Sequence, residues 1–385
     1  MKREPSPPRS DFAEEARRIG FQFASADGEV YWDESVRYVF SLAQIENDLE
    51  TAVAELHALC LELVDRVAAS EASLRRLRIP ECAWEPIAQS WRRRDPSLYG
   101  RFDFAYDGAG PPKLLEYNAD TPTSLYEAAV VQWRWLEQLT ARGALPRDAD
   151  QFNSLHEKLI ARWSGVARGE FVHLACMMSE VEDRGTLAYI EDCARQSGLS
   201  TQALDMSDIG LARARFVDRS GRAIKRMFKL YPWEWMFADA FGRSPAILAT
   251  RFVEPPWKMI LANKGMLALL WEIAPRHPNL LACYFEGDAR AATLGRYARK
   301  PLYSREGADV ELIGAGSRVA GRAAGYGAEG FVRQELRLLP CFDRRYPALG
   351  CWVVGDEPAG MGVREDASPI TSNRSRFVPH AIIDR

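Results

Sequence analysis

The sequence of 385 residues has no apolar run that approaches the ~20 residues of a membrane-spanning helix. Its first residues, MKREPSPPRSDF, lack the apolar segment of a signal peptide, so we expect a cytoplasmic protein. The net charge of −3 provides no field of one sign, which argues against nucleic acid or a membrane surface as partner. Hydrophobic residues make up 47% and charged residues 27%, which are the proportions of a globular protein with an ample core.

Cysteines are few, and no two of them stand in a CxxC arrangement. This scatter argues against a zinc site and a disulfide framework, and it predicts buried thiols in a reducing compartment. His57 and His380 have no spacing to Cys60 that supports a cysteine nucleophile, so core or surface roles are expected for all three. The sequence also contains neither GxxxxGKS nor GxGxxG, which argues against a P-loop and a dinucleotide fingerprint. The seven cysteines are Cys60, Cys82, Cys176, Cys193, Cys283, Cys341 and Cys351.

The N-terminal part combines a polar segment with a long apolar periodicity. Residues 1–12 are rich in proline, which predicts a loose tail. Apolar residues recur at helical spacing from residue 31 to residue 70, which predicts a long packing helix with Asp33 or Ser35 as its cap. Residues 13–385 are long enough for one large domain or two to three ordinary ones.

Strand and helix patterns alternate after residue 170. FVHLACM is a buried-strand run, EDRGTLAYIEDCARQSG is a helix closed by Gly198, and STQALDM is a second strand run, which together predict a parallel α/β unit. RFVDRSGRAIKRMFKLY predicts a hairpin that turns at DRSG. Further on we expect a helix at NKGMLALLWEIA, strands at YARKPLYS and FVRQELRLL, and a hairpin around GDEPAG. The glycine-rich residues 314–330 predict no regular element.

Residues 101–123, RFDFAYDGAGPPKLLEYNADTPT, contain two strand-like runs around a turn-rich DGAGPP. Because alternate residues of a strand share a face, Arg101 and Asp103 point to the same side. A loop that is symmetric about its centre pairs Asp103 with Glu116 and Arg101 with Asn118. Like charges directly opposite each other destabilise a sheet, so the pair of carboxylates requires an explanation.

Two interpretations of this hairpin remain open from the pattern alone. In one, a divalent cation lies between the carboxylates, because Mg²⁺ takes one or two carboxylates beside substrate phosphates. In the other, the hairpin is a solvated sheet in which Arg101 neutralises both acids. Lys264 and Lys300 are candidates for binding phosphate, and Arg364 is a candidate for clamping a phosphoryl group. Taken singly, each of these cations is more typical of a protein surface, although Gly307 in the following turn can bring backbone amides near an anion.

Eight segments occur in an order that resembles one known family. They are YWDE with ELHALC, RFDF with LLEYNADTPT, EDRGTLAYIEDCA, YPWEWM, NKGML, RKPLYSREGADV, FVRQEL, and MGVRED with ITSNRSRFVPH. From about Phe21 to the C-terminus they are similar to the synthetase domain of the glutathionylspermidine synthase family, an ATP-grasp type. The separate amidase domain of that family has no counterpart here, so the chain resembles the stand-alone acid–amine ligases of the family.

The resemblance implies an α+β fold, namely a circularly permuted ATP-grasp with a pre-ATP-grasp α/β lobe. That lobe is expected at roughly residues 150–250, and the ATP-grasp lobes are expected from the remainder. The implied activity is that of a ligase forming carbon–nitrogen bonds. ATP activates a substrate carboxylate to an acyl phosphate, which an amine then attacks to give an amide. The implied cofactors are ATP and Mg²⁺, with two metal ions.

Carried over motif by motif, the resemblance assigns roles to residues of this chain. Asp103, Glu116 and Asn118 match the magnesium ligands. Arg101 matches the residue that steadies the transferring phosphoryl group, and Arg364 matches a catalytic-site arginine. The nucleotide-binding positions are Lys264 and Lys300 at the phosphates, Glu306 and Gly307 in the loop that closes over them, Gln334, Glu335 and Leu336 on the strand that meets adenine, and Ile370 near the nucleotide.

The substrates are less well defined by the resemblance. Thr121, Thr123, Glu182 and Glu234 lie near matched motifs and are the candidates for lining the acid or amine pocket. The expected partners are a small carboxylic acid or peptide and an amine, and acidic neighbours would suit a polyamine. Neither glutathione nor spermidine follows from the sequence, and neither does the oligomeric state. The alternatives are a different ATP-grasp peptide ligase and a non-enzymatic ATP-binding protein, and the intact set of matched site residues argues against the second.

Overall fold

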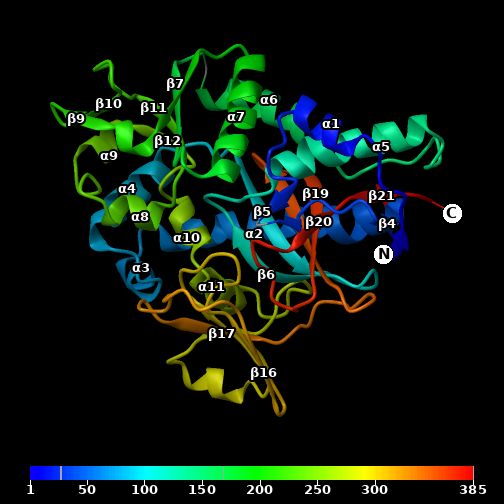
Figure 1. The fold of residues 1–385 in the computed structure, drawn as a ribbon. Coiled ribbons are helices and arrows are strands. Elements are labelled where there is room, and N and C mark those ends of the chain that lie inside the picture. The colour runs from blue at the N-terminus through cyan, green and yellow to red at the C-terminus, as the bar shows by residue number, and fades with distance from the viewer. Residues whose placement is uncertain (27, 168, 385) are drawn as a thin grey trace.

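Five antiparallel strands in the order β20-β19-β18-β5-β6 form the central sheet of the computed structural model, which describes residues 1–26, 28–167 and 169–384 (Figure 1). Both hairpins expected in this sheet are present. The register of β5 and β6 pairs Asp103 with Glu116 and Arg101 with Asn118, which confirms the prediction. The strands are β5 (Tyr99–Ala105), β6 (Lys113–Asn118), β18 (Tyr346–Val354), β19 (Glu357–Asp366) and β20 (Arg376–Val378).

The two faces of the central sheet differ in chemistry because side chains alternate along each strand. Phe102 stacks on Tyr117 at 3.9 Å between ring centroids, and both belong to the core that includes helix α2 (Thr51–Val67). Arg101 and Asp103 lie on the opposite face. Complete burial of a phenylalanine side chain contributes on the order of 2 kcal/mol, so the aromatic face fixes the hairpin that carries the polar groups.

A second sheet is parallel, with strand order β12-β11-β7-β8. Strand β7 (Val172–Cys176), helix α7 (Val181–Gln196) and strand β8 (Thr201–Asp205) form the predicted strand–helix–strand unit. The hairpin expected over residues 215–231 is wrong in its second half. The turn is present, but β11 (Arg226–Leu230) pairs in parallel with β7 and with β12 (Arg251–Val253). Most of β11 is buried, and a buried apolar run is typical of a parallel strand.

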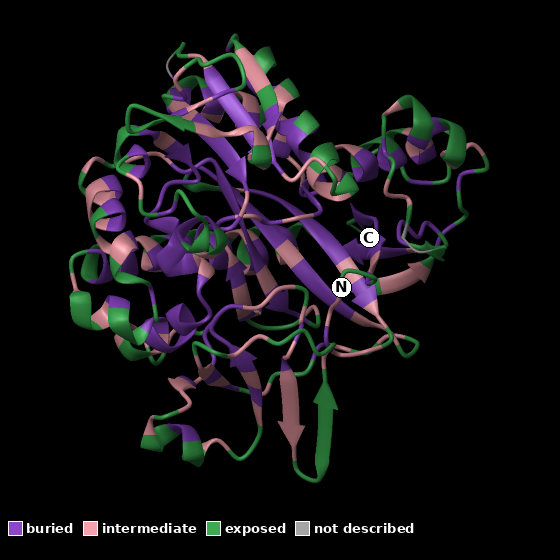
Figure 2. Ribbon diagram, turned by 60° about the vertical axis from the view of Figure 1, so that its left-hand side comes forward, coloured by how far each residue is buried: buried purple, intermediate pink, exposed green. Residues whose placement is uncertain are grey.

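A third sheet has the strand order β13-β17-β14-β15-β16, and helix α11 (Gly265–Ile273) packs against it. The expectation of no regular element from residue 314 is wrong at its start, because β15 and β16 pair around a turn with Gly316 at φ +79°. All four residues of β16 are exposed, and this hairpin projects from the body of the molecule (Figure 2). The strands are β13 (Cys283–Phe285), β14 (Tyr297–Pro301), β15 (Glu311–Gly314), β16 (Ser317–Ala320) and β17 (Phe331–Glu335).

The N-terminal segment is ordered, contrary to the expected loose tail. Strand β1 (Lys2–Pro5) pairs with β4 (Val36–Phe40), which also pairs in parallel with β21 (His380–Ile382). The predicted cap at Asp33 or Ser35 is therefore wrong, since helical structure starts only after β4, with η1 (Gln44–Glu50) leading into α2. The strand prevails because it gains partners from both ends of the chain, which local periodicity does not reveal.

The remaining elements cover these sheets, and buried residues concentrate in the central strands and the helices against them (Figure 2). No helix in the described ranges is long and apolar enough to cross a membrane. Five of the seven cysteines are buried, and none forms a disulfide in the described part of the chain. The other helices are α1 (Phe12–Arg18), α3 (Glu71–Arg76), α4 (Glu81–Arg92), η2 (Glu127–Val131), α5 (Gln132–Ala141), α6 (Leu155–Ala167), η3 (Met206–Asp208), α8 (Trp233–Ala238), α9 (Ala246–Ala249), α10 (Lys258–Ala262) and η4 (Ala289–Thr293), and the other strands are β2 (Ser25–Ala26), β3 (Glu29–Val30), β9 (Gly210–Ala212) and β10 (Arg215–Val217).

Candidate active site

The polar face of the β5–β6 hairpin carries a connected network of charges. Arg101 donates from Nε to Asp103 Oδ1 at 2.6 Å and from Nη2 to Asp103 Oδ2 at 2.9 Å. Asn118 donates from Nδ2 to Asp103 Oδ2 at 3.1 Å and to Glu116 Oε1 at 3.4 Å. The arginine thus neutralises one acid in a two-pronged contact, and the amide separates the two carboxylates.

Two lysines approach the same hairpin from the third sheet and its helix. Lys264, just before α11, lies with Nζ at 3.2 Å from Glu116 Oε2 and donates to the Ser304 carbonyl at 2.8 Å. Lys300 on β14 donates to the Leu115 carbonyl at 2.7 Å and to Gln334 Oε1 at 2.8 Å. The solvated-hairpin interpretation is therefore wrong in one respect, because a lysine from a distant segment, Lys264, pairs with Glu116.

The charges of this network shift the pKa values of its members. Burial alone raises the pKa of a carboxyl group, but Lys264 and Lys300 outweigh it at Glu116 and lower its pKa to about 2. At Asp103 burial dominates over Arg101, and the pKa is raised. Burial lowers the pKa of Lys300 to about 8 in spite of the nearby Glu116. Glu116 is thus an ionised carboxylate at neutral pH, held beside two cations.

Arg364 lies beside the hairpin, in the wall of a hollow on the same face. Arg101, Asp103 and Arg364 line it together, with Trp352 as an apolar wall. Gly350 makes room for the arginine, because a Cβ atom at this position would lie 2.7 Å from Arg101 Cδ. Arg364 donates to the Ser372 carbonyl at 2.6 Å, while its buried Nε has no hydrogen-bond partner among the described residues.

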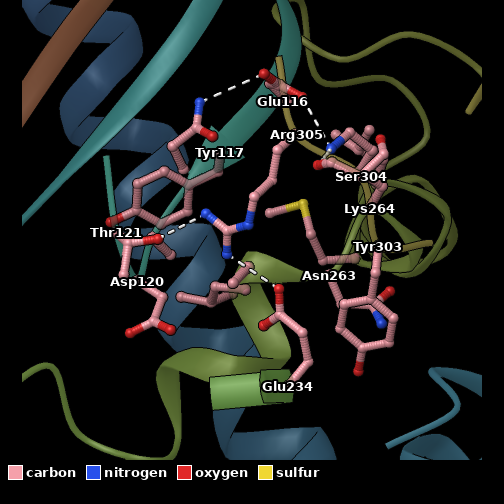
Figure 3. A pocket seen from close by; sticks show the side chains of 16 residues that line it. Glu116, Tyr117, Asp120, Thr121, Glu234, Asn263, Lys264, Tyr303, Ser304 and Arg305 are labelled. Carbon is pink, nitrogen blue, oxygen red and sulfur yellow. Dashed lines mark hydrogen bonds and ion pairs between the residues drawn. The ribbon is translucent and has the colours of Figure 1, made fainter. Parts of the chain in front are cut away.

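A second pocket borders Glu116 and Asn118, and Arg305 reaches across it (Figure 3). Arg305 donates to Thr121 Oγ1 at 2.9 Å and to Glu234 Oε1 at 3.0 Å. Arg305 is not among the residues predicted from the sequence, although its place directly before Glu306 in the matched loop was a usable signal. The buried Nε of Arg305 and the hydroxyls of Tyr303 and Ser304 lack partners among the described residues, so several donors line this pocket without acceptors.

The loop expected to close over the phosphates meets the segment expected near the nucleotide. Glu306 and Gly307 have φ values of +53° and +66°, in the left-handed region. A Cβ atom on Gly307 would overlap the Thr371 carbonyl and lie 2.6 Å from Ile370 Cγ2, so only glycine allows this approach. The structure therefore brings Gly307 and Ile370 into contact.

Two of the residues expected at adenine are placed differently from their neighbour Gln334. Gln334 is buried and donates to the Leu114 carbonyl at 2.9 Å, which joins β17 to the hairpin. The backbone N–H groups of Glu335 and Leu336 donate to the carbonyls of Ala282 and Arg296. The Glu335 side chain is exposed. Strand β17 lies between β13 and β14, so its backbone is paired with strands on both sides.

The four candidate substrate residues divide between two places. Glu234 lies in the pocket of Arg305 and is neutralised by it. Glu182 lies in a separate hollow with Glu127, and Thr123 is close to it. Burial and the charge of Glu182 raise the pKa of Glu127 to about 7. Of the two predicted acids, Glu234 is paired with Arg305, whereas Glu182 lies beside a second carboxyl group, that of Glu127.

The donor set of the hairpin fits a magnesium ion that brings its own phosphate ligands. Asp103, Glu116 and Asn118 offer hard oxygen atoms on one face, and Mg²⁺ is commonly bound by one or two carboxylates together with substrate phosphates and water. The described residues contain no group of three or more His, Cys, Asp or Glu side chains able to hold a metal ion. A metal here therefore needs the phosphates as further ligands.

Comparison with known proteins places the chain in a family. The model of the family described as glutathionylspermidine synthase preATP-grasp matches residues 3–383. The chain belongs to the glutathionylspermidine synthase family. This family consists of ligases that form carbon–nitrogen bonds and that use ATP with a divalent metal ion.

Relatives from several organisms agree with this assignment. A protein of Haemophilus influenzae named "Putative acid--amine ligase" is 41% identical over 98% of this chain and 98% of its own length. The trypanothione synthetase of Crithidia fasciculata is 29% identical over 84% of the chain, and the bifunctional glutathionylspermidine synthetase/amidase of Escherichia coli is 27% identical over 94%. The chain covers only 53% and 62% of the lengths of these two relatives.

A solved structure shares the fold at low identity. The glutathione synthetase-like effector of Globodera pallida, in its apo form, matches with a TM-score of 0.57 over 97% of this chain and 96% of its own, at 12% sequence identity. The chain thus shares its mixed α/β fold, with helices packed against several sheets, with this structure.

Proposed function

We propose that the protein is an ATP- and Mg²⁺-dependent ligase that joins a carboxylic acid to an amine through an acyl-phosphate intermediate. The observation that supports this most directly is the single network formed by Arg101, Asp103, Asn118, Glu116 and Lys264. It combines oxygen ligands for a metal with cations for phosphates on one face of a sheet whose other face packs in the core. When bound, Mg²⁺ would draw negative charge from the phosphate oxygens and so ease transfer of the terminal phosphoryl group.

We further propose that the fold is a circularly permuted ATP-grasp. The central sheet and the β13–β17 sheet are then the two lobes that hold the nucleotide, and the parallel sheet is the core of the pre-ATP-grasp lobe at roughly residues 150–250. Contacts between Lys300 and Leu115 and between Gln334 and Leu114 support this arrangement, because they join the two proposed nucleotide-binding sheets at the hairpin.

The residues of the chain have separable tasks in this proposal. Asp103, Glu116 and Asn118 hold two magnesium ions, and Lys264 and Lys300 bind phosphate oxygens. Arg101 and Arg364 stabilise the charge that develops on the transferring phosphoryl group, since both guanidinium groups face one hollow. Glu306 and Gly307 close over the phosphates, while the backbone of Gln334, Glu335 and Leu336, together with Ile370, forms the adenine side.

The acid is assigned to the pocket of Arg305, and the amine is assigned to the hollow of Glu182 and Glu127. Thr121 and Arg305, with their unpartnered neighbours, offer donors to a carboxylic acid or peptide. Glu182 and Glu127 line the hollow proposed for the amine, with Thr123 close to Glu182. In the reaction the amine nitrogen attacks the acyl carbon, phosphate leaves with the electrons of the carbon–oxygen bond, and the nitrogen loses a proton.

This proposal is tested by measuring ADP release for every pair of a carboxylate and an amine from a set of candidate compounds. Hydroxylamine replaces the amine in parallel wells, because it traps an acyl phosphate as a hydroxamate. We expect one acid to give a hydroxamate without any amine and an amide with its matching amine. ADP release that is independent of every acid contradicts ligation. A requirement for two amino acids or peptides identifies a peptide ligase, and ATP binding without turnover identifies a non-enzymatic protein.

A further inference from the structure

Four consecutive residues, Asn118 to Thr121, link the end of β6 to the pocket of Arg305. The side chain of Asn118 donates to Asp103, and the hydroxyl of Thr121 accepts from Arg305. Between them, Ala119 and Asp120 are buried, and the Ala119 carbonyl and the Asp120 carboxylate each accept a hydrogen bond from a buried lysine. The position of the two outer side chains therefore depends on what holds the two inner residues.

Asp120 is held by a fully buried ion pair. Lys229, near the end of β11, donates from Nζ to Asp120 Oδ1 at 2.7 Å, and the two side chains are 0% and 2% exposed. The second oxygen, Oδ2, accepts the backbone N–H of Trp233 at 2.9 Å. Lys229 also donates to the Tyr231 carbonyl at 2.8 Å and lies 4.3 Å from the centre of the Trp233 ring.

A second buried lysine fixes the adjoining peptide. Lys258 on α10 donates from Nζ to the Ala119 carbonyl and to the Tyr99 carbonyl, both at 3.1 Å. Its charge is compensated by Glu254 at 3.4 Å, and both side chains are completely buried. Two buried lysines from different elements, Lys229 on β11 and Lys258 on α10, thus hold the turn after Asn118 by hydrogen bonds.

The pair of Asp120 and Lys229 also joins the turn to helix α8. Trp233 is the first residue of that helix, and the next residue, Glu234, is the partner of Arg305 in the pocket. A shift of Asp120 would therefore move Asn118, Thr121 and Glu234 together. Burying two charges costs free energy that their mutual attraction largely offsets, so a buried ion pair adds little net stability. Its effect here is to hold the two segments in a fixed relative position.

We propose that Asp120 and Lys229 are positioning residues, whose buried pair sets the place of Asn118 and Thr121 and couples both to Glu234. The inference rests on the proposed function only for the ligand that Asn118 binds. The pair also orders two segments whose paired residues are 109 positions apart in the sequence, and this ordering can be tested in the protein without any ligand.

The double variant Asp120→Asn/Lys229→Met tests this, because it removes both charges and leaves no unpaired ion in the core. Either single variant leaves a buried partner uncompensated and is prone to unfold. In the ligand-free double variant we expect at least tenfold faster amide hydrogen exchange at residues 118–121 and 233–236. Calorimetry should show at least tenfold weaker binding of ATP with Mg²⁺, and unchanged binding of ATP with EDTA.

The matched control is Asp218→Asn, which breaks the buried pair of Asp218 and His173 at 3.2 Å beside the same parallel sheet. Its two side chains are 1% exposed, and we expect lower stability but wild-type exchange at residues 118–121 and wild-type affinity for ATP with Mg²⁺. Wild-type exchange in the double variant, or equal changes in the control, overturns the inference. A wild-type protein whose ATP affinity ignores Mg²⁺ contradicts the proposed function instead.

Discussion

At the scale of single residues, Glu116 is the side chain on which the charges of the site converge. It contacts Lys264 and Asn118, and the charges of Lys264 and Lys300 lower its pKa to about 2. Glu116→Gln keeps the size of the side chain and removes the charge. We expect the turnover to fall at least about a hundredfold, which corresponds to ~3 kcal/mol of lost transition-state stabilisation.

Stability should change little in the same variant. Glu116 is partly accessible, with 29% of its side chain exposed, and such ion pairs contribute about 0–1 kcal/mol. The melting temperature and ADP release are measured together, with the acid and amine identified as substrates. A Glu116→Gln protein that melts normally and turns over at the wild-type rate would remove Glu116 from the proposed metal site.

Glu127 predicts a pH dependence of stability. Burial and the nearby Glu182 raise its pKa from 4.5 to about 7, while Tyr31 and Arg364 oppose the shift. Between these two pH values the folded state binds more protons than the unfolded state. The free energy of unfolding should therefore fall as the pH rises from about 4.5 to about 7, by on the order of 3 kcal/mol at most from this group.

Comparison with Glu127→Gln isolates this contribution, because the amide does not titrate. Urea unfolding at pH 5, 6, 7 and 8 should give a shallower decline for the variant. Parallel curves for the two proteins over this range would show that Glu127 ionises as in an exposed position.

At the scale of elements, strand β18 leaves space for the side chain of Arg101, because it has a glycine, Gly350, at the point of contact. Gly350 faces Arg101, and a Cβ atom there would lie 2.7 Å from Arg101 Cδ. Gly350→Ala should push the guanidinium off Asp103 and lower turnover at least tenfold, while the sheet remains folded. Gly295→Ala is the matched control, since nothing lies within 4 Å of its added Cβ. Equal activity of the two variants would show that the position of Arg101 is not critical.

The same scale shows where sequence patterns suffice. The β5–β6 hairpin could be predicted in type and register, because alternation and a symmetric loop are local properties. Strand β4 could not, because its hydrogen-bond partners are residues 2–5 and 380–382, while its own apolar pattern also fits a helix. Strand β11 was assigned to a hairpin because a turn precedes it, and only the parallel sheet around it decides its partner.

At the scale of the whole molecule, the site combines segments from most of the chain. The matched motifs predicted its members, and the structure joins Asp103, Glu116 and Asn118 with Lys264 in one network. The matched loop marks Arg305 as a candidate, but the sequence could not reveal its contacts with Thr121 and Glu234 or the pair of Asp120 and Lys229. Those contacts connect residues 71 to 184 positions apart, and no local pattern distinguishes such a cation from one on the surface.

The contacts between the sheets predict that ATP and Mg²⁺ act together on the whole molecule. Without the metal, the phosphates would face the carboxylates of Asp103 and Glu116 and would compete with them for Arg101 and Lys264, so calorimetry should show much weaker binding of ATP in EDTA than with Mg²⁺. Binding at the loop of Glu306 and Gly307 should then order the following residues 314–330, because Gly321 already packs against the Gly307 carbonyl.

Trypsin reports this ordering, since Arg318 and Arg322 in that span are exposed. We expect cleavage there to slow at least severalfold with ATP and Mg²⁺ together, and to change little with either alone. Cleavage after Arg147, in an exposed loop away from the nucleotide side, should proceed at the same rate in every sample and serves as the internal control. Protection by ATP in EDTA would separate nucleotide binding from the metal, and loss of protection in Glu116→Gln with Mg²⁺ present would connect the closure of the loop directly to the hairpin.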